Sequence, residues 1–350
     1  MTELLQDILA EPAELAGILD RLLGPQRREL DSAAALIGGA RHVYVAGIGS
    51  SWHAGMAVCS FFDAVARPAL LAEASELLHF GAIPPDSALL VLSRSGRSVE
   101  IVKLVRKARE AGAKIIGVTN TPDSPLARES DVVISLDARF DHLVSVSMYS
   151  GVALAGALAA SAALGSLGDA TAAALRASLV AAGESIDGWR RRIDESEWPG
   201  PGAPIYLLAR GASLASCHEA RLAFEEATKS PASALTTGGY RHGPQESIHE
   251  GLRIALWLDG AKMRSEDIAL AEDSRRAGAH VMLIGQNIPA DAGDLVVNLP
   301  AILPEWQFLI DIIPAQLAAE CLARRKGVDC DSFRLCPYII ESEGGLSARS

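Results

Sequence analysis

Cysteine is scarce in this chain, and no group of residues has the spacing of a metal site. The five cysteines are odd in number and include no CxxC pair, so we expect neither a disulfide framework nor a zinc site. The sequence also lacks HExxH and any other paired-histidine spacing. Free cysteines fit a reducing compartment, and we therefore predict a cytoplasmic protein without a metal ion.

A surplus of basic residues is absent as well. Lys and Arg number 32 against 43 Asp and Glu, which gives a formal net charge of −11. A nucleic-acid binder or a protein that adsorbs to anionic membranes normally carries the opposite balance. A small anionic substrate remains possible, because a local group of N–H donors can hold it whatever the global charge.

No segment predicts secretion or membrane insertion. The N-terminal MTELLQDILAEP is acidic and has no apolar core of a signal peptide. The most hydrophobic long stretch, residues 151–165, is mostly Ala and Gly and is too short to cross a bilayer. It predicts a tightly packed helix in a soluble protein with no membrane partner.

Length and composition predict two folded domains. Apolar residues make up 49% of the 350 residues and charged residues 21%, which is enough apolar surface for a full core. Single cores seldom exceed about 250 residues. The clearest linker is PGPGAP at residues 199–204. We therefore predict one domain at residues 1–198 and a second at 199–350.

Short apolar runs alternate with helical segments on both sides of this linker. Such alternation favours an α/β fold in which helices flank a parallel sheet on both faces, a three-layer, flavodoxin-like arrangement. The predicted strands are residues 42–46, 88–93, 114–119 and 132–136 in the first half, and 205–209, 252–258, 280–284 and 295–299 in the second. Ala-rich helices from about residue 142 to 192 would complete the first domain.

The two halves resemble one another in sequence. RHVYVAGIGS at residues 41–50 runs from a strand into a glycine turn, as does PIYLLARGAS at residues 204–213. Farther along, KIIGVTN at residues 114–120 parallels HVMLIGQ at residues 280–286. The two offsets, 163 and 166 residues, are close enough to predict a duplicated fold.

Two turns rich in serine and glycine follow predicted parallel strands of the first half. They are GIGSS at residues 47–51 and SRSGRS at residues 93–98, each placed before a helix. Glycine lets the backbone approach an anion, while serine hydroxyls and the first N–H groups of a helix supply donors. Serines at such positions often only cap helices. Two such turns in one domain favour phosphate binding, and the first is not a dinucleotide fingerprint.

These motifs resemble those of the sugar isomerase (SIS) domain family. SRSGRS matches the family's S-x-S-G-x-[ST] loop, and the whole chain is similar to the double-SIS isomerase half of glutamine–fructose-6-phosphate aminotransferase and its deaminase and deglycase relatives. Further matches, in family order, are DILAEP at residues 7–12, GSS at 49–51, ASEL at 74–77, YRHGP at 240–244 and GVDCDSFR at 327–334.

The resemblance implies two tandem SIS domains and a sugar-phosphate substrate. It implies phosphate binding by Ser50, Ser51, Ser93, Ser95, Gly96 and Ser98. The implied catalytic residues are Glu226, His242 and Glu219, with Gly49, Ser145, Ser147, Arg241 and Tyr338 as possible further substrate contacts. The family analogy also implies a homodimer with a shared active site and no organic cofactor. The acidic DCD at residues 329–331 is structural in the family.

Glu219 and Glu226 can also be judged from their spacing. With Ala223 they fall at i, i+4 and i+7, which places them on one helix face beside small apolar residues. A glutamate there can carry a proton between two adjacent carbons. The plainer interpretation is two solvated surface charges. His242 has an intrinsic pKa range suited to acid–base work, and its motif alone distinguishes it from the other histidines.

Three lysines of the aminotransferase pattern are missing. Ala223 stands one turn before Glu226 where the family has lysine, Tyr338 replaces a lysine near the C-terminus, and Met148 replaces the lysine that ends the first domain. Without an amine at these positions, Schiff-base chemistry is not expected. The chain also begins at the SIS region, without the cysteine nucleophile of a glutamine-hydrolysing domain.

The sequence therefore predicts a phosphosugar isomerase-type enzyme acting on a hexose or amino-sugar 6-phosphate. In this prediction His242 assists ring opening and Glu226 transfers the proton between C1 and C2. A fructosamine-6-phosphate deglycase or an amino-sugar-phosphate deaminase is the nearest alternative, since both would use Glu226. A sugar-phosphate sensor without catalysis is the alternative from a different class.

Overall fold

The structure is a computed structural model that describes residues 1–345. Its contacts divide the chain into two units. Unit A comprises Ala13–Arg176 and the chain from Phe333 onward, and unit B comprises Met1–Pro12 and Ala177–Ser332. Two of the three divisions fall inside helices, α1 (Glu3–Leu23) and α8 (Asp169–Glu195), and the third lies between Ser332 and Phe333. The predicted domain boundary between residues 198 and 199 stays a prediction.

Unit A contains a five-stranded, fully parallel sheet in the order β2-β1-β3-β4-β5. Its strands are β1 (His42–Gly47), β2 (Leu70–Glu73), β3 (Ser87–Leu92), β4 (Lys114–Thr119) and β5 (Val132–Ser135). All six residues of β3 are buried, because helices cover both faces of the sheet. The central strands therefore read as continuous apolar runs, which is what made them predictable.

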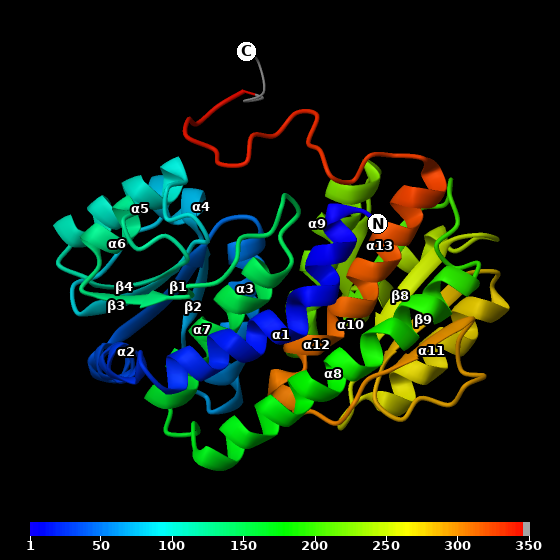
Figure 1. Cartoon of the computed structure of the whole chain (residues 1–350), viewed down its shortest axis with the longest axis horizontal. Helices are drawn as coiled ribbons and strands as arrows, with labels where there is room; N and C mark the ends of the chain where they lie inside the picture. Colours follow the sequence, from blue (N-terminus) through cyan, green and yellow to red (C-terminus); the bar gives the residue numbers. More distant parts are fainter. Residues whose placement is uncertain (346–350) are drawn as a thin grey trace. The chain divides into compact units, whose positions relative to one another are not determined.

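The helices of unit A form one layer on each face of its sheet. They are α2 (Arg27–Gly39), α3 (Ser50–Ala64), α4 (Ala74–His79), α5 (Val99–Glu110), α6 (Pro125–Glu129) and α7 (Ser147–Ala163). Figure 1 shows α4, α5 and α6 on one face, and contacts join α2, α3 and α7 on the other. Helix α7 is buried along almost its whole length, as its Ala- and Gly-rich sequence predicts. On Gly156, an added methyl group would lie 2.7 Å from Val58 of α3.

Unit B repeats this topology. Its parallel sheet has the order β10-β9-β8-β6-β7, so β6 corresponds to β1 and β8 corresponds to β3. The strands are β6 (Ile205–Ala209), β7 (Ser233–Thr236), β8 (Arg253–Trp257), β9 (His280–Gly285) and β10 (Leu295–Asn298). Two parallel sheets with equivalent strand orders confirm the predicted α/β fold and its internal duplication.

Unit B also has helices on both faces of its sheet. They are α9 (Ser213–Thr228), α10 (Thr237–Arg241), α11 (Arg264–Arg276), α12 (Phe308–Asp311) and α13 (Ile313–Lys326), with short 3-10 turns at Pro244–Ser247 and Pro304–Trp306. Side chains of α10 and α11 share one apolar cluster with β8 and β9. Helix α9 contacts β6 and β7, and α13 packs against α9. Among residues 1–345, no helix combines the length and apolar character needed to cross a membrane.

The sequence pattern located eight of the ten strands to within one or two residues. It missed β2 and β7, which have four residues each, lie at sheet edges and include exposed positions. The other two edge strands, β5 and β10, also have four residues but are rich in Val, and the sequence pattern located them. β7 (SALT) has polar residues at both ends, and β2 (LLAE) passes directly into α4, so neither stands out as a separate apolar run. Helix α3 begins at Ser50, two residues before the predicted start.

The Pro- and Gly-rich segment before β6 is held firmly against unit B. The indole Nε1 of Trp198 donates to the carbonyls of Ile254 and His280, 3.2 and 3.0 Å away. The Arg253 guanidinium donates in turn to the Trp198 carbonyl. A methyl group on Gly200 would come within 2.5 Å of Arg253 Nη2. The predicted linker is thus packed, ordered chain.

The acidic DCD segment holds the start of the chain. The Asp331 carboxylate accepts the N–H groups of Glu3 and Leu4, both at 2.9 Å, at the first turn of α1. Asp329 accepts the N–H of Asp331 and the hydroxyl of Ser332. Carboxylates at a helix N-terminus satisfy donors that have no partner within the helix. Asp331 therefore has a structural role.

Asp311 is a fully buried carboxylate at the end of α12. It accepts hydrogen bonds from the hydroxyls of Ser213 and Ser216, at the start of α9, and from the Gln307 amide. Burial raises its pKa from 3.8 to about 6, and these hydrogen bonds offset only part of the effect. Asp311 therefore anchors the N-terminus of α9 to α12.

We expect the raised pKa of Asp311 to give unit B a measurable pH dependence. The protonated acid is favoured in the folded state, so its contribution is complete below pH 3.8 and is lost as the pH rises through about 6. Between pH 5 and pH 7 the wild type should lose about 1 kcal/mol of unfolding free energy relative to Asp311→Asn. Urea unfolding of both proteins at the two pH values measures this difference, and parallel pH curves would contradict it.

Candidate functional site

Two serine-rich turns of unit A lie at the carboxyl edge of its sheet. Strands β1 and β3 are hydrogen-bonded neighbours, so the turns that follow them emerge side by side. The strand order changes direction between β1 and β3, and ligands of open α/β sheets bind outside such a point. We call residues 47–51 the first serine turn and residues 93–98 the phosphate loop.

The first serine turn passes directly into α3. Gly49 is the N-cap residue with φ of +57°, a backbone conformation that glycine adopts without strain. The backbone is close-packed here, since a methyl group on Gly47 would come within 2.6 Å of the Ser51 carbonyl. Ser50 and Ser51 are the first two residues of α3 and are partly exposed. Their N–H groups belong to the donor-rich first turn of a 15-residue helix.

The phosphate loop is shaped by its own serines. The hydroxyl oxygen of Ser93 accepts the N–H of Gly96 at 3.0 Å, and that of Ser95 accepts the N–H of Arg97 at 3.2 Å. The Arg94 carbonyl is held from β4 by the hydroxyl of Thr119. These contacts use oxygen lone pairs and leave the two serine O–H groups able to donate.

The serine hydroxyls do not act as helix caps. Ser98 occupies the N-cap position of α5, yet its side chain makes no capping hydrogen bond. The N-cap of α3 is Gly49, and the hydroxyls of Ser50 and Ser51 make no hydrogen bond with the rest of residues 1–345. Capping would have explained these serines without a ligand. The structure leaves their hydroxyls available to one.

Gly96 lets the phosphate loop press against a neighbouring helix. Its φ is +60°, and a methyl group there would lie 2.3 Å from the Ser124 hydroxyl oxygen and 2.7 Å from the Ser124 Cβ. Ser124 is itself fixed as the N-cap of α6. Both the backbone conformation and the lack of space therefore require glycine at this position.

The C-terminal segment lies against the phosphate loop. The Arg94 guanidinium stacks over the Tyr338 ring, 4.1 Å from its centroid, and donates to the Tyr338 carbonyl. The Ile340 carbonyl accepts the N–H of Val99, the first residue of α5. Tyr338, which the sequence suggested only as a possible substrate contact, is thus fixed beside the loop.

A second contact ties Tyr338 to the turn before α7. The Tyr338 hydroxyl donates to the Asp141 carbonyl at 3.3 Å. The Asp141 carboxylate accepts the N–H groups of Val146, Ser147 and Met148 at the start of α7. Ser145 and Ser147 are both buried, at 8% and 1% exposure. Asp141 therefore connects the C-terminal segment to the start of α7, which includes Ser147.

We expect the Tyr338 ring to hold the C-terminal segment in place. Tyr338→Ala removes the stacking on Arg94, an interaction of about 1–2 kcal/mol when partly shielded from water. Amide hydrogen exchange of residues 338–343 should then speed up about tenfold. Tyr338→Phe keeps the ring and loses only the hydroxyl, so its exchange should stay within threefold of wild type. Equal exchange in the alanine and phenylalanine variants would show that the ring is not the anchor.

The predicted catalytic glutamates lie in unit B, on α9. Glu219 is 1% exposed and Ala223 is 3% exposed, so the shared face faces the interior. Glu226, three residues after Ala223 on the same face, is partly buried. The interpretation as two solvated charges therefore fails for Glu219. On another side of the helix, Glu225 forms an ion pair with Arg221.

The carboxyl end of α9 is held by two lysines. Lys229 is the C-cap residue with φ of +55°, and its ammonium donates to the carbonyls of Glu226 and Ser332. The Lys326 ammonium donates to the Thr228 carbonyl. Cations at a helix C-terminus satisfy carbonyls that have no partner within the helix. Together with Asp311 at the other end, these contacts fix the position of α9.

His242 follows α10, the short helix after edge strand β7. The Thr236 hydroxyl accepts the N–H of Gly239 and starts this helix, and His242 is its C-cap residue. Arg241 and His242 are both exposed. Tyr240 is fully buried, and its ring meets that of Tyr206 edge-on at 5.2 Å. Burial also raises the pKa of Tyr240 to about 12, so its hydroxyl remains protonated at neutral pH.

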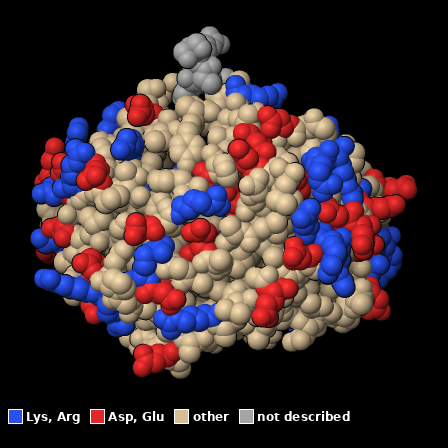
Figure 2. All heavy atoms as spheres, viewed as in Figure 1, with Lys and Arg blue, Asp and Glu red and all other residues tan. Residues whose placement is uncertain are grey.

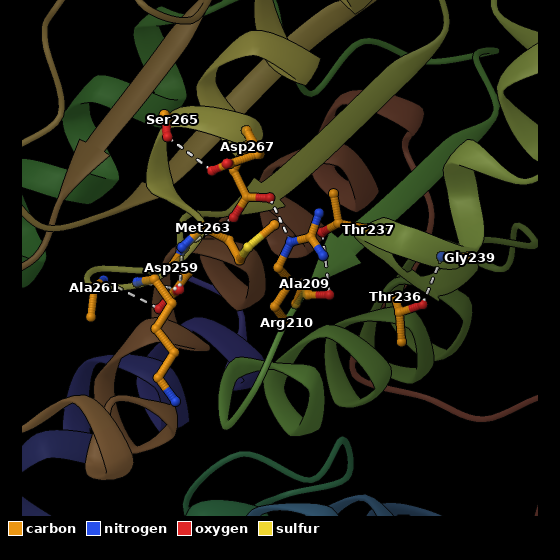
Figure 3. Close-up of polar contacts among 12 residues, drawn as sticks. Ala209, Arg210, Thr236, Thr237, Gly239, Asp259, Ala261, Met263, Ser265 and Asp267 are labelled. Atoms are coloured by element: carbon orange, nitrogen blue, oxygen red, sulfur yellow. Dashed lines mark hydrogen bonds and ion pairs between the residues drawn. The ribbon is translucent and has the colours of Figure 1, made fainter.

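An ion pair that the sequence analysis did not predict lies at the carboxyl edge of the unit B sheet. Arg210, directly after β6, donates through Nε to the carboxylate of Asp267 in α11 at 2.8 Å. Figure 3 shows the Arg210 side chain between Asp267 and Thr237. Beside it, the Asp259 carboxylate accepts the N–H groups of residues 261–263. In unit B, the N–H groups of the loop after β8 therefore donate to carboxylates of the chain itself.

The face of the molecule drawn in Figure 2 has no extended basic patch. Lys and Arg side chains there are interspersed with Asp and Glu. Within residues 1–345, no group of three His, Cys, Asp or Glu side chains is arranged to hold a metal ion. The candidate groups for chemistry are therefore the serine loops of unit A and the Glu and His residues of unit B.

Sequence reasoning missed three residues that organise these groups. Arg94 lies inside the serine-rich motif, and its charge was the available signal. Asp141 was visible only as part of a motif, and its capping role depends on how the chain folds back. Arg210 stands where the internal repeat aligns it with Gly47 of the first serine turn. A charged residue in place of glycine was a signal that the second turn had changed its role.

Comparison with protein families identifies a domain in the first half of the chain. The model of the SIS domain family matches residues 36–164, which include both serine loops. Curated relatives include glutamine–fructose-6-phosphate aminotransferase (isomerizing) of Pyrobaculum aerophilum, 26% identical over 344 residues and covering 95% of this chain and 56% of that protein. The corresponding protein of Pseudomonas aeruginosa is 25% identical over 349 residues, covering 95% of this chain and 57% of that protein. The chain therefore spans little more than half the length of these relatives.

Solved structures share the fold over nearly the whole chain. The C-terminal domain of glucosamine-fructose-6-phosphate aminotransferase from Francisella tularensis has a TM-score of 0.83 at 22% identity, covering 94% of this chain and 97% of that one. Tagatose-6-phosphate ketose/aldose isomerase from Escherichia coli has a TM-score of 0.79 at 18% identity, covering 96% of each chain. These likenesses confirm the predicted fold of two α/β units.

Proposed function

Because the model of the SIS domain family matches residues 36–164, we propose that this protein is a phosphosugar isomerase-type enzyme acting on a hexose or amino-sugar 6-phosphate. The observation that carries the proposal is the phosphate loop of unit A. Its serine hydroxyls are not used for capping, and its glycine is required by both backbone angle and space. Donors from two loops and two helix N-termini are what a phosphate group needs.

In the proposed reaction, Glu226 carries the proton. Isomerisation of an aldose to a ketose removes a proton from C2 and returns it to C1 through an enediol, or an enolamine for an amino sugar. One carboxylate that reaches both carbons can do this, because it alternates between base and acid. Glu226 lies on a helix that is fixed at both ends. This supports the proposal, because the carboxylate must stay within reach of both carbons.

His242 would assist ring opening, which must precede the proton transfer. The cyclic sugar opens when its anomeric hydroxyl loses a proton and its ring oxygen gains one. His242 is exposed, and its imidazole has two ring nitrogens through which it can accept and donate protons. In the same proposal Glu219, which is buried on the same helix, is the further catalytic candidate. The homodimer and the cytoplasmic location remain predictions.

Covalent Schiff-base chemistry has little support in this chain. Ala223 is buried on α9, Met148 is buried in α7, and the Tyr338 ring is stacked against Arg94. None of these side chains carries an amine. The proposal therefore uses proton transfer alone.

Deuterium exchange tests the proposed reaction. The protein is incubated in deuterated water with a panel of hexose, amino-sugar and fructosamine 6-phosphates, and C1 and C2 are followed by NMR. We expect deuterium at one or both carbons of at least one panel member. Free amine measured in the same samples separates deaminases and deglycases from a simple isomerase. Phosphate-dependent binding without any exchange would reject the enzyme and favour a sensor.

A further inference from the structure

Arg210 of unit B connects three elements at the carboxyl edge of the sheet. It follows β6 directly, and its Nε donates to Asp267 in the first turn of α11. The Asp267 side chain is completely buried, whereas the Arg210 side chain is 22% exposed. Burial raises the pKa of Asp267, and the hydrogen bond from Arg210 acts in the opposite direction. The second oxygen of Asp267 accepts the N–H of Asp259, which leaves the carboxylate little freedom to move.

The same arginine lies along the start of α10. The Arg210 guanidinium lies close to the backbone of Gly238, since a methyl group added there would be 3.9 Å from Nη1. The Thr237 hydroxyl donates to the carbonyl of Ala209, the residue before Arg210, at 3.3 Å. Figure 3 shows Thr237 and Asp267 on opposite sides of the Arg210 guanidinium.

Helix α10 depends on its neighbours for its position, and Thr237 and Tyr240 are its buried residues. It has five residues and follows an edge strand of four. A helix this short has no stability of its own and depends on tertiary contacts. Its buried anchor is Tyr240, which contacts Tyr206, while Arg241 and His242 at its end are exposed. The Arg210 side chain supports the start of the helix, opposite the end that carries His242.

We propose that Arg210, oriented by Asp267, is a positioning residue that fixes α10 and thereby the place of His242. The inference rests on the proposed function, in which His242 assists ring opening. Asp267 holds the guanidinium by one edge, so that its other edge is turned toward α10. A planar guanidinium held in this way has a fixed orientation, which the flexible ammonium of a lysine would not reproduce.

Hydrogen exchange and steady-state kinetics of Arg210→Gln test this inference. We expect amide exchange of residues 237–242 to accelerate at least tenfold. With the substrate that the deuterium panel identifies, kcat should fall at least tenfold while KM stays within twofold, because the phosphate loop lies in unit A. Inhibition by inorganic phosphate should likewise stay unchanged. Arg275→Gln is the matched control. Arg275 lies elsewhere on α11 and pairs with Asp294, so this variant should alter none of these quantities.

Two further variants keep the test decisive. Arg210→Lys retains the charge and should restore less than half of the lost kcat, whereas a merely electrostatic role predicts full rescue. If Arg210→Gln does not fold, Asp267→Asn frees the arginine while leaving a hydrogen-bonding side chain, and exchange at residues 237–242 should still accelerate.

The outcomes also separate this inference from the proposed function. Uniform acceleration of exchange throughout unit B, or equal losses in the Arg275 control, would overturn the positioning role. Local acceleration at residues 237–242 in a protein whose wild type never exchanges deuterium would instead overturn the proposed reaction. In that case Arg210 positions α10 without serving that chemistry.

Discussion

Replacing Glu226 by glutamine should slow deuterium exchange at C1 and C2 by a factor of about 10²–10⁴, the range in which a positioned general base acts. Glutamine has nearly the same shape and cannot accept the proton. Affinity for inorganic phosphate should remain within twofold of wild type, because the serine loops belong to unit A. NMR of the exchanging sugar measures the first quantity, and a phosphate titration measures the second.

Glu225→Gln provides the matched control for this experiment. Glu225 is adjacent on α9, has similar exposure and pairs with Arg221 on another side of the helix. A partly exposed pair one turn apart contributes about 0.5 kcal/mol or less, so its loss should change neither folding nor exchange appreciably. Equal losses in the two variants would show that the effect comes from α9 and not from the Glu226 carboxylate.

Gly96→Ala should weaken phosphate binding at least tenfold. Alanine at a φ of +60° costs about 1–2 kcal/mol in backbone strain. Its methyl group would also overlap Ser124, whose hydroxyl oxygen would be only 2.3 Å away, so the loop must move. Such a displacement would move Ser95 and Ser98 from the positions that they hold in the wild type. Titration with inorganic phosphate, followed by ³¹P NMR, measures the loss.

Gly112→Ala separates strain from displacement of the loop. Gly112 has a φ of +80° at the far end of α5, and a methyl group there would meet no atom within 4 Å. This variant should lose a similar 1–2 kcal/mol of unfolding free energy and keep full phosphate affinity. Reduced affinity in Gly112→Ala would mean that general destabilisation explains the result at Gly96.

Much of the fold could be predicted because the central strands are buried on both faces. β3, β4 and β8 are continuous apolar runs, and their lengths and spacing identify them without any contact information. The duplication was visible for the same reason, since equivalent buried strands keep similar composition. β2 and β7 escaped because LLAE and SALT are short and include polar residues, unlike the Val-rich edge strands β5 and β10.

The serine loops were predictable because a phosphate-binding turn is local in sequence. A strand, a glycine turn and a helix N-terminus follow one another within about ten residues, so a motif records the whole geometry. Glu219 and Glu226 were predictable as a pair because helical spacing places them on one face. Whether that face was buried could not be read from the spacing.

By itself, then, the sequence determined the α/β class, the doubled architecture and the residues of each loop, all of which depend on neighbouring positions. Only the tertiary structure decided which of these residues meet distant ones. It brought Tyr338 to Arg94 and Asp141, Asp311 to the start of α9, and Arg210 to Asp267. Each of these contacts joins residues from separate elements, up to 244 positions apart. Their energy depends on burial and mutual orientation, which exist only once the layers have packed.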